Sequence, residues 1–273
     1  MTKEENALDH YVLAHGSAGR ARLNVLARVM EAGTESLLKR VGIEAGAACL
    51  DVGCGGGDVS LLLARHVGAD GSVVGVDLDE AKLESARQEA GEAGLGQVSY
   101  RTASVFDLAP DESFDIVYSR FLLTHLADPA GAIEAMLGAL RPGGRLVLED
   151  IDFSGHFAFP DFPALWDYVR LYSAAVATTG GDANIGPRLP GLLKASGLAE
   201  VGMQVSQPAA LSGDAKLITP ITMESIGQRV IEAGLATAEE VRRIAKELTK
   251  AANDPTVVMG TPRIVQTWGR KPS

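Results

Sequence analysis

The spacing of apolar residues changes period along this chain of 273 residues. Residues 7–41 carry apolar side chains at helical spacing, interrupted at Gly33, where Thr34 is expected to cap a second helix. From residue 48 onward, short apolar runs alternate with amphipathic segments. This alternation is typical of strands joined by crossover helices, so it predicts an α/β fold with a doubly wound, mostly parallel sheet.

Seven strands are expected in this sheet, each a short segment between polar or turn-forming residues. They cover residues 48–52, 72–77, 97–101, 113–120, 145–151, 200–205 and 264–268. The helices between them have recognisable starts, such as Asp79 as an N-cap and Asp128 followed by Pro129. Two additional helices are expected before the last strand, at about 208–254, and the second begins with the capping box Thr237-x-x-Glu240.

The first strand ends in a glycine-rich turn. Gly53, Gly55 and Gly57 follow the strand, and an amphipathic helix begins directly afterwards. Glycine lets the backbone adopt positive φ and lets a ligand approach without meeting a Cβ atom. The turn also directs unpaired helix N–H groups toward the space above the strand end. The pattern therefore predicts a ligand-binding loop.

Two kinds of nucleotide-derived ligand are the alternatives for this loop. A dinucleotide fingerprint G-x-G-x-x-G needs its third glycine at position 58, where Asp58 would repel the pyrophosphate. The spacing Asp51-x-Gly53-x-Gly55-x-Gly57 instead resembles motif I of class I S-adenosylmethionine-dependent methyltransferases, whose ligand carries a sulfonium and an ammonium group that carboxylates attract. Asp77, at the end of the next strand, fits both ligands, because each contains a ribose whose two hydroxyls can donate to a carboxylate.

The resemblance to these methyltransferases extends over residues 45–150 and is of the ubiquinone/menaquinone-biosynthesis type. Phe114-Asp115-x-Val117 resembles the F-D-x-V signature of the family, and Arg141-Pro142-Gly143-Gly144 also matches it. Such enzymes bind S-adenosyl-L-methionine and release S-adenosyl-L-homocysteine. The resemblance implies ten cofactor-binding positions: Tyr11, Asp51, Gly53, Cys54, Gly55, Asp77, Leu78, Ser104, Val105 and Arg120.

The resemblance also implies roles for particular residues. In similar enzymes an N-terminal aromatic residue and an arginine can touch the methionine end of the cofactor, and Tyr11 and Arg22 precede the glycine loop in this way; otherwise Tyr11 is packed and Arg22 solvated. The family often places Asp beside the adenine, where this chain has Ser104, which can donate or accept one hydrogen bond. The segment 121–126 is expected to lie over the cofactor's sulfur.

A single methyltransferase domain is expected over residues 1–273. Residues 1–44 would form an N-terminal helical cover, residues 45–152 the cofactor-binding core, and residues 153–273 a substrate-side half that contains the helical insertion. Helices would lie on both faces of the sheet. The insertion is expected either to cover the active site or to form a dimerisation surface, so a homodimer is left open.

Methyl transfer from a sulfonium needs little chemistry from the protein, because the donor is already activated. Alignment of donor and acceptor can contribute ~7–11 kcal/mol without a covalent step. The sequence accordingly contains no G-x-S-x-G, H-E-x-x-H or P-loop motif, and no metal site is expected. A hydroxyl or ammonium acceptor would need a general base. His125 and His156 are the catalytic candidates because imidazole titrates near neutrality, and Glu149, Asp150 and Asp152 could also accept a proton.

Aromatic residues crowd into residues 153–172, directly after the fifth strand. Part of this cluster, including Tyr172, falls on a helical stripe typical of a core. Phe153, His156 and Phe157 would lie near the methyl group and could form the wall of a substrate pocket. The expected acceptor is therefore a small, partly apolar molecule that is methylated on oxygen, nitrogen or carbon.

Charge and composition weigh against several other classes of protein. The formal net charge is −10, and no basic stripe is present, which disfavours nucleic-acid binding. No apolar run reaches the ~18–20 residues that span a bilayer, and the polar N-terminus lacks the apolar core of a signal peptide. Only Cys49 and Cys54 are present, which argues against a structural zinc site and a disulfide. We therefore expect a cytoplasmic enzyme with no metal, membrane or nucleic-acid partner.

Two alternative functions would use the same cofactor. Some members of this fold use the bound sulfonium without transferring a methyl group, or methylate a protein or RNA, although the acidic charge weighs against RNA. A non-enzymatic member could bind S-adenosylmethionine to regulate a partner protein. Motif I and Asp77 indicate only competence to bind, so the sequence leaves these alternatives open.

Overall fold

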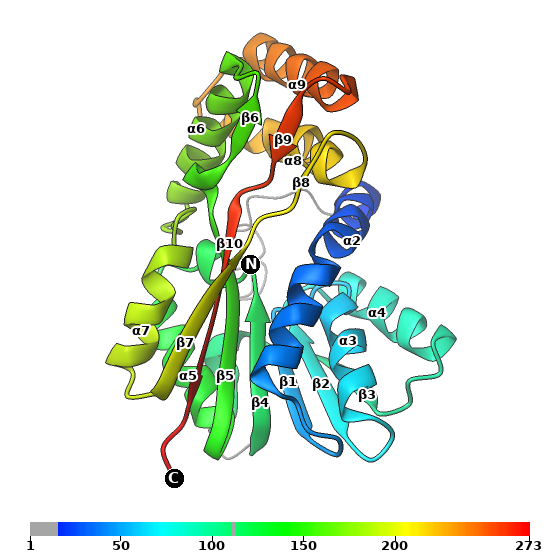
Figure 1. Cartoon of the computed structure of the whole chain (residues 1–273), viewed down its shortest axis with the longest axis vertical. Coiled ribbons are helices and arrows are strands. Elements are labelled where there is room, and N and C mark those ends of the chain that lie inside the picture. Colours follow the sequence, from blue (N-terminus) through cyan, green and yellow to red (C-terminus); the bar gives the residue numbers. More distant parts are fainter. Residues whose placement is uncertain (1–15, 111–112) are drawn as a thin grey trace.

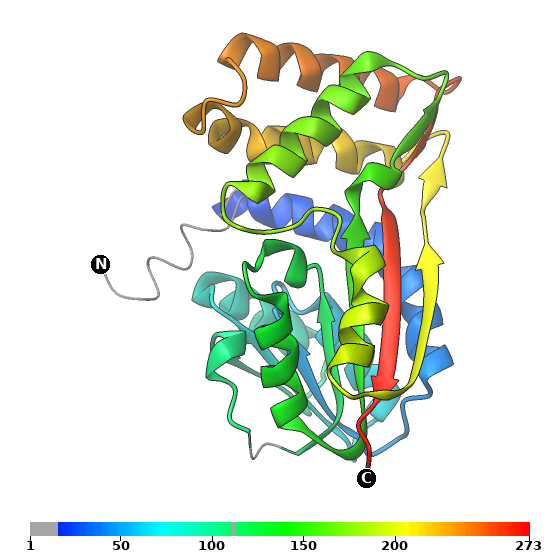
Figure 2. The same ribbon diagram turned by 90° about the vertical axis from the view of Figure 1, so that its left-hand side faces the viewer.

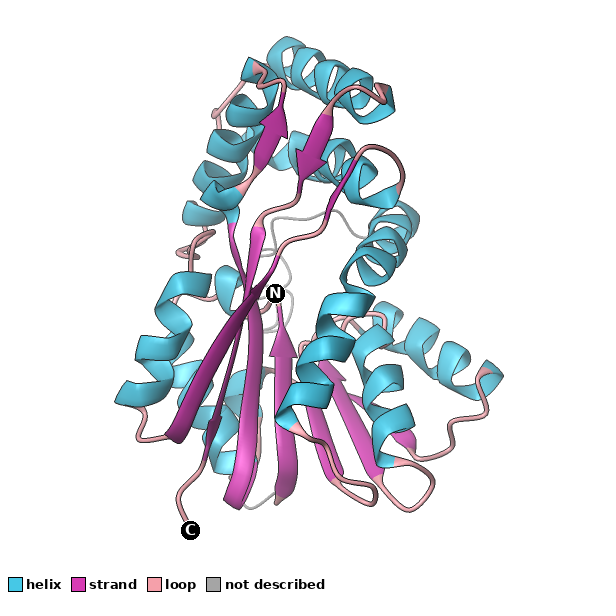
Figure 3. Cartoon of the chain, in the orientation of Figure 1, coloured by secondary structure: helices cyan, strands magenta, loops and turns pink. Residues whose placement is uncertain are grey.

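The computed structural model describes residues 16–110 and 113–273, with side chains described from Arg22 onward, so the predicted site residue Tyr11 lies outside the described residues. Seven strands form the main sheet in the order β3-β2-β1-β4-β5-β10-β7, and every neighbouring pair is parallel except the two pairs that include β10 (Figure 1, Figure 3). The strands are β1 Ala48–Val52, β2 Ser72–Asp77, β3 Val98–Thr102, β4 Phe114–Arg120, β5 Leu140–Asp152, β7 Ala199–Ser206 and β10 Arg263–Arg270. The strand order changes direction between β1 and β4, which is the switch point of a doubly wound sheet.

Helices cover both faces of this sheet, as the alternating pattern predicts. One face packs against α2, α3 and α4, and the other packs against α5 and α7. These helices are α2 Gly16–Val41, α3 Asp58–Val67, α4 Glu80–Glu92, α5 Pro129–Ala139 and α7 Leu189–Ala195. Two of the predicted N-caps, Asp79 and Asp128, are confirmed, because their side chains accept backbone N–H groups at the starts of α4 and α5.

A second layer lies beyond the carboxyl ends of the strands. It contains α6 Pro163–Ala177, α8 Asp214–Glu232 and α9 Ala238–Asn253, which begins with the predicted capping box, and Figure 2 shows it stacked above α2. Its apolar core joins Met30 of α2 to Phe153, Met223 and Ile244. A small antiparallel sheet in the order β6-β9-β8 accompanies it, with β6 Phe157–Phe159, β8 Ala209–Ala210 and β9 Val258–Gly260. Within the described part of the chain, no helix combines the length and the apolar character that a membrane span requires.

Lys216 ties together the two ends of the helical insertion between β7 and β10. Its side chain is completely buried, and Nζ donates to the carbonyls of Leu211, Asp254 and Val257 at 3.1, 2.6 and 2.7 Å. These carbonyls lie before α8 and after α9. One ammonium group, whose three donors are all satisfied, therefore joins the segment before α8 to the segment after α9.

Two local features differ from the sequence-based predictions. The predicted interruption at Gly33 is wrong, since α2 continues through it. Gly33 instead permits close packing, because a Cβ there would lie 2.5 Å from Ser206 Oγ, and Thr34 donates to Glu149 rather than capping a helix. The β6-β9-β8 sheet was not predicted, because strands of two or three residues carry no periodic signal.

Glu149 of β5 connects α2 to the sheet. Its side chain is 2% exposed, and the carboxylate accepts hydrogen bonds from Thr34 of α2 at 2.8 Å, from Tyr118 of β4 and from Gln266 of β10. A buried carboxylate is tolerated only when its oxygens are satisfied in this way. The network therefore fixes the position of α2 above the strand ends.

We expect Glu149→Leu to lower the free energy of unfolding by about 2–4 kcal/mol, because three buried donors lose their acceptor. Urea denaturation measures this loss. Glu247→Leu is the same substitution on an exposed face of α9 and should change the free energy by less than about 0.5 kcal/mol. Equal effects at both positions would contradict the structural role of Glu149.

Candidate active site

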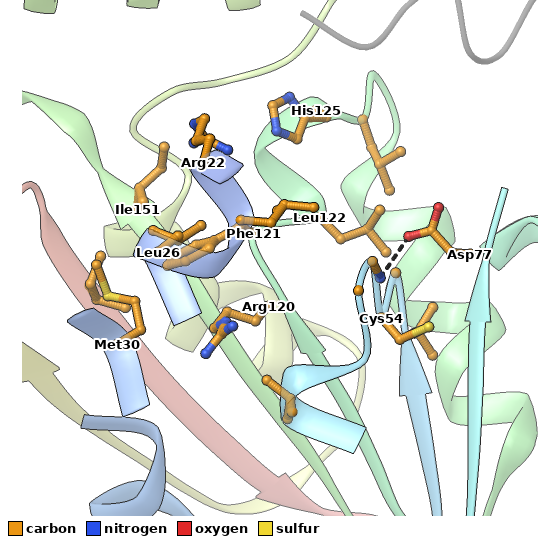
Figure 4. Close-up of a pocket in the computed structure, with 18 of the residues that line it drawn as sticks. Arg22, Leu26, Met30, Cys54, Asp77, Arg120, Phe121, Leu122, His125 and Ile151 are labelled. Atoms are coloured by element: carbon orange, nitrogen blue, oxygen red, sulfur yellow. Dashed lines mark hydrogen bonds between the residues drawn. The ribbon is translucent and has the colours of Figure 1, made fainter. Parts of the chain in front are cut away.

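A cavity of about 450 Å³ lies between the carboxyl ends of the strands and the upper layer (Figure 4). The segments after β1, β2, β3 and β4 line one side, and residues of α2, α6 and α8 line the other. This is the position at which doubly wound sheets bind ligands. The volume falls within the ~300–1,000 Å³ typical of small-molecule sites.

The loop after β1 presents its backbone to the cavity. Gly53 and Gly55 have φ values of 72° and 54°, which other residues rarely adopt, and a Cβ at Gly55 would meet no atom within 4 Å. The N–H of Gly55 donates to Asp77 Oδ2 at 2.9 Å, which is the dashed line in Figure 4, and the N–H of Asp79 donates to Oδ1 at 3.0 Å. Asp77 is therefore held beside the loop, and its oxygens retain lone pairs for a ligand.

Two acids and an arginine complete this end of the cavity. Burial raises the pKa of Asp51 to about 7, while a hydrogen bond from Ser60 Oγ at 2.6 Å acts in the opposite direction. Arg120, at the end of β4, forms an ion pair with Asp58 and donates to Thr34 Oγ1 at 3.1 Å. The guanidinium is thus neutralised and held between α3 and α2.

The other predicted cofactor positions Cys54, Leu78, Ser104 and Val105 also line the cavity. Ser104 Oγ accepts the N–H of Phe106 at 3.2 Å, so its hydroxyl hydrogen can still donate to a ligand. Burial raises the pKa of the Cys54 thiol well above its usual value, which keeps this wall uncharged. Nine of the ten predicted positions therefore meet in one cavity, and only Tyr11 falls outside the described residues.

Phe121 follows β4 with a left-handed backbone, φ 57°, a conformation that costs a side-chain-bearing residue about 1–3 kcal/mol. Its N–H donates to the carbonyl of Glu149 at 2.9 Å, and its ring centroid lies 5.5 Å from the guanidinium carbon of Arg120. Phe121 and Leu122 line the cavity, and Leu122 packs against Gly53, where a Cβ would come within 3.2–3.3 Å of it. The strained turn therefore places two apolar side chains over the glycine loop.

Both predicted histidines line the cavity. Burial, followed by the positive charges of Arg22 and Lys82, lowers the pKa of His125 to about 3. Burial lowers the pKa of His156 to about 4, although the carbonyl of Phe153 acts in the opposite direction. His156 Nδ1 lies 2.8 Å from that carbonyl, so Nδ1 carries the proton and Nε2 is an acceptor. Both side chains are therefore neutral at pH 7.

The three carboxylates near the end of β5 do not belong to the described lining of the cavity. Glu149 is occupied by the α2 network. Asp150 accepts two backbone N–H groups, and burial raises its pKa to about 7. Asp152 forms an ion pair with Arg263 at 2.7 Å. Because of these contacts, the structure does not support the hypothesis that one of these three carboxylates accepts a proton from a substrate.

The far side of the cavity is aromatic and rich in hydroxyl groups. Phe153 and Tyr172 stack with centroids 3.8 Å apart, and Tyr168 meets Phe153 edge to face at 5.3 Å. Thr219 and Thr222 of α8 line the same side. The sequence predicted Phe153 here but missed these threonines, because only the packing of the insertion brings them to the site. Phe157, also expected here, is 39% exposed and outside the described lining.

Burial of His156 makes the stability of the fold sensitive to acid. Its pKa is about 4 in the folded chain against 6.5 for an ordinary histidine, so only the unfolded state takes up this proton between those values. The stabilisation is present above pH 6.5 and is lost as the pH falls toward 4. Between pH 7 and pH 5 we expect the unfolding free energy of the wild type to fall by about 2 kcal/mol more than that of His156→Asn.

Urea denaturation at several pH values measures this difference. As an internal control, the two proteins should change nearly in parallel between pH 7 and pH 8, where the folded state takes up none of this proton and the unfolded state only a small fraction of it. Parallel behaviour down to pH 5 would mean that His156 is protonated equally in the folded and unfolded chains.

The sheet order, the glycine loop after β1 and the carboxylate at the end of β2 define a Rossmann-like fold. Residues 43–179 match the family described as a methyltransferase domain, and the chain belongs to that family.

Curated relatives extend the comparison. The ubiquinone biosynthesis O-methyltransferase of Xanthomonas euvesicatoria is 44% identical over 110 residues, which cover 40% of this chain and 44% of that protein. The ubiquinone/menaquinone biosynthesis C-methyltransferase of Vibrio vulnificus is 32% identical over 180 residues, covering 63% of this chain and 66% of that protein. The chain thus spans less than two thirds of the length of each of these relatives.

A solved structure shares the fold over the whole chain. Phosphoethanolamine N-methyltransferase 2 of Haemonchus contortus, in complex with phosphomonomethylethanolamine and S-adenosylhomocysteine, has a TM-score of 0.60 at 15% identity. The match covers 100% of this chain and 61% of that one. At this level of identity the likeness concerns the architecture alone.

Proposed function

We propose that this protein transfers a methyl group from S-adenosyl-L-methionine to an oxygen, nitrogen or carbon atom of a small, partly apolar molecule. The observation that carries the proposal is the cavity, which joins an acidic, glycine-lined end to an aromatic end. Membership of the methyltransferase family supports the reaction class. The relatives named above act in quinone biosynthesis by O- and C-methylation, which supports a small acceptor.

The residues at the acidic end fit the methyl donor. Asp77 would accept the ribose hydroxyls, and Ser104 with the backbone of Val105 would contact the adenine. The open space over Gly55 would receive the methionine portion, with Arg120 and Asp58 offering opposite charges to its carboxylate and ammonium groups. When bound, S-adenosylmethionine supplies a methyl group already activated by its positive sulfur.

The protein itself would contribute mainly by positioning the acceptor against the methyl donor. The aromatic side chains of Phe121, Phe153 and Tyr172 exclude water and hold the acceptor, and alignment of this kind can contribute ~7–11 kcal/mol. For a hydroxyl acceptor, Nε2 of His156 would accept the departing proton. Its pKa of about 4 makes it a weak base, which suffices because an oxygen that gains a methyl group becomes strongly acidic.

Thermal unfolding with added ligands tests the donor. S-adenosylmethionine and S-adenosylhomocysteine, each at ~100 times the dissociation constant, should stabilise the wild type by about 2.7 kcal/mol. Asp77→Ala should lose this stabilisation, whereas Asp70→Ala, the same substitution at an exposed residue, should keep it. Stabilisation by NAD alone would contradict the proposed donor.

Transfer itself is tested with S-adenosylmethionine that carries an isotopically labelled methyl group. The label should appear in small molecules of a fractionated extract, and it should be reduced when Asp77→Ala replaces the wild type. Label in protein or RNA would point to a macromolecular acceptor. Tight cofactor binding with no label transferred from any fraction would favour a non-enzymatic, regulatory role.

A further inference from the structure

Arg22 is a buried cation in the wall of the cavity. It lies on α2 and is 9% exposed, and its Nε donates to Thr222 Oγ1 of α8 at 3.2 Å. In the described part of the chain, Thr222 is the only hydrogen-bond partner of this guanidinium, and no carboxylate forms an ion pair with it. A buried charge destabilises a fold unless it is paired, so this arrangement calls for an anion that the described residues do not supply.

The other cations in the described lining differ from Arg22. Arg120 is paired with Asp58, and Lys82 lies 3.5 Å from Asp79. Each of these cations is therefore neutralised within the protein. Arg22 alone among the three faces the cavity without a carboxylate partner in the described chain.

The acids of the cavity lie at the opposite end. Asp51 lies near the end of β1, Asp77 ends β2 and Asp58 begins α3, so all three surround the glycine loop. Figure 4 shows Arg22 and Asp77 on opposite sides of Phe121 and Leu122. The cavity is thus acidic where a sulfonium ligand would bind and basic where its second occupant would bind.

The side chains around Arg22 indicate the chemical character of the rest of this second ligand. Thr222 and Tyr168 provide hydroxyl groups on the same wall, and Phe153 and Tyr172 provide flat apolar surfaces. A planar guanidinium pairs most favourably with a planar carboxylate, through two parallel hydrogen bonds.

We propose that the methyl acceptor is a carboxylic acid with an aromatic or other apolar body, and that Arg22 binds its carboxylate. This inference rests on the proposed function and names the class of substrate for the same cavity. Arg22 determines which acceptors bind, and it leaves the affinity for the methyl donor unchanged. The carboxylate is an anchor, while the atom that receives the methyl group lies elsewhere on the acceptor.

Calorimetric titration in the presence of saturating S-adenosylhomocysteine tests the proposal. The probes are benzoate, 3,4-dihydroxybenzoate, 4-hydroxycinnamate and octanoate, each compared with its own methyl ester. At least one acid should bind the wild type more tightly than its ester. Arg22→Met should raise the dissociation constant of that acid by about 10–100-fold, the range for lost hydrogen bonds to a charged group. The dissociation constant of Arg22→Lys should lie between those of the wild type and Arg22→Met. Arg28→Met, on an exposed part of the same helix, should bind as the wild type does.

Two further readouts separate this role from others. Affinity for S-adenosylhomocysteine should be the same in Arg22→Met and the wild type, and the melting temperature of the unliganded variant should stay level or rise, since an unpaired buried charge is removed. Loss of S-adenosylhomocysteine binding in Arg22→Met alone would assign Arg22 to the donor and overturn the inference. It is also overturned if no acid binds more tightly than its ester. Failure of the wild type to bind S-adenosylhomocysteine at all would instead remove the proposed function.

Discussion

The buried carboxylate of Glu149 is the contact on which the shape of the cavity depends. Its oxygens accept hydrogen bonds from donors of α2, β4 and β10, so one side chain holds the helix and the strands together. The same helix carries Arg22, Leu26 and Met30 across the cavity. The distance of α2 from the strand ends is therefore set by a hydrogen-bond network in the sheet as well as by the apolar packing of the upper layer.

Burial is the common cause of the unusual chemistry in this cavity. It raises the pKa of Asp51 and lowers the pKa values of His125 and His156, so in each case burial opposes the charged form of the side chain. The charges that persist, such as that of Arg22, act through a medium that screens them weakly. Each remaining charge is therefore a strong determinant of what can enter the cavity.

Local patterns predicted the main sheet, its helices and the glycine loop, because each depends on neighbours in sequence. The position of Asp77 in the site was predictable, since it ends the next apolar strand after that loop. The threonines of α8 were not, because their position depends on how the insertion packs against α2, which no local period encodes. The continuity of α2 through Gly33 was missed for a related reason: the glycine serves a distant contact with Ser206 rather than a local break. The cofactor-binding and catalytic roles assigned to the site residues, those of Tyr11, His125 and His156 included, stay predictions.

The hydrogen bonds of Lys216 affect how this fold can diverge. Because they join the segment before α8 to the segment after α9, the insertion enters and leaves the sheet at nearly the same point. Substitutions within α8 and α9 can then alter Thr219 and Thr222 in the cavity wall without displacing the glycine loop, which belongs to the first third of the chain. The cavity wall formed by the insertion and the glycine loop thus belong to separate parts of the chain, so the choice of acceptor can change while the loop keeps its geometry.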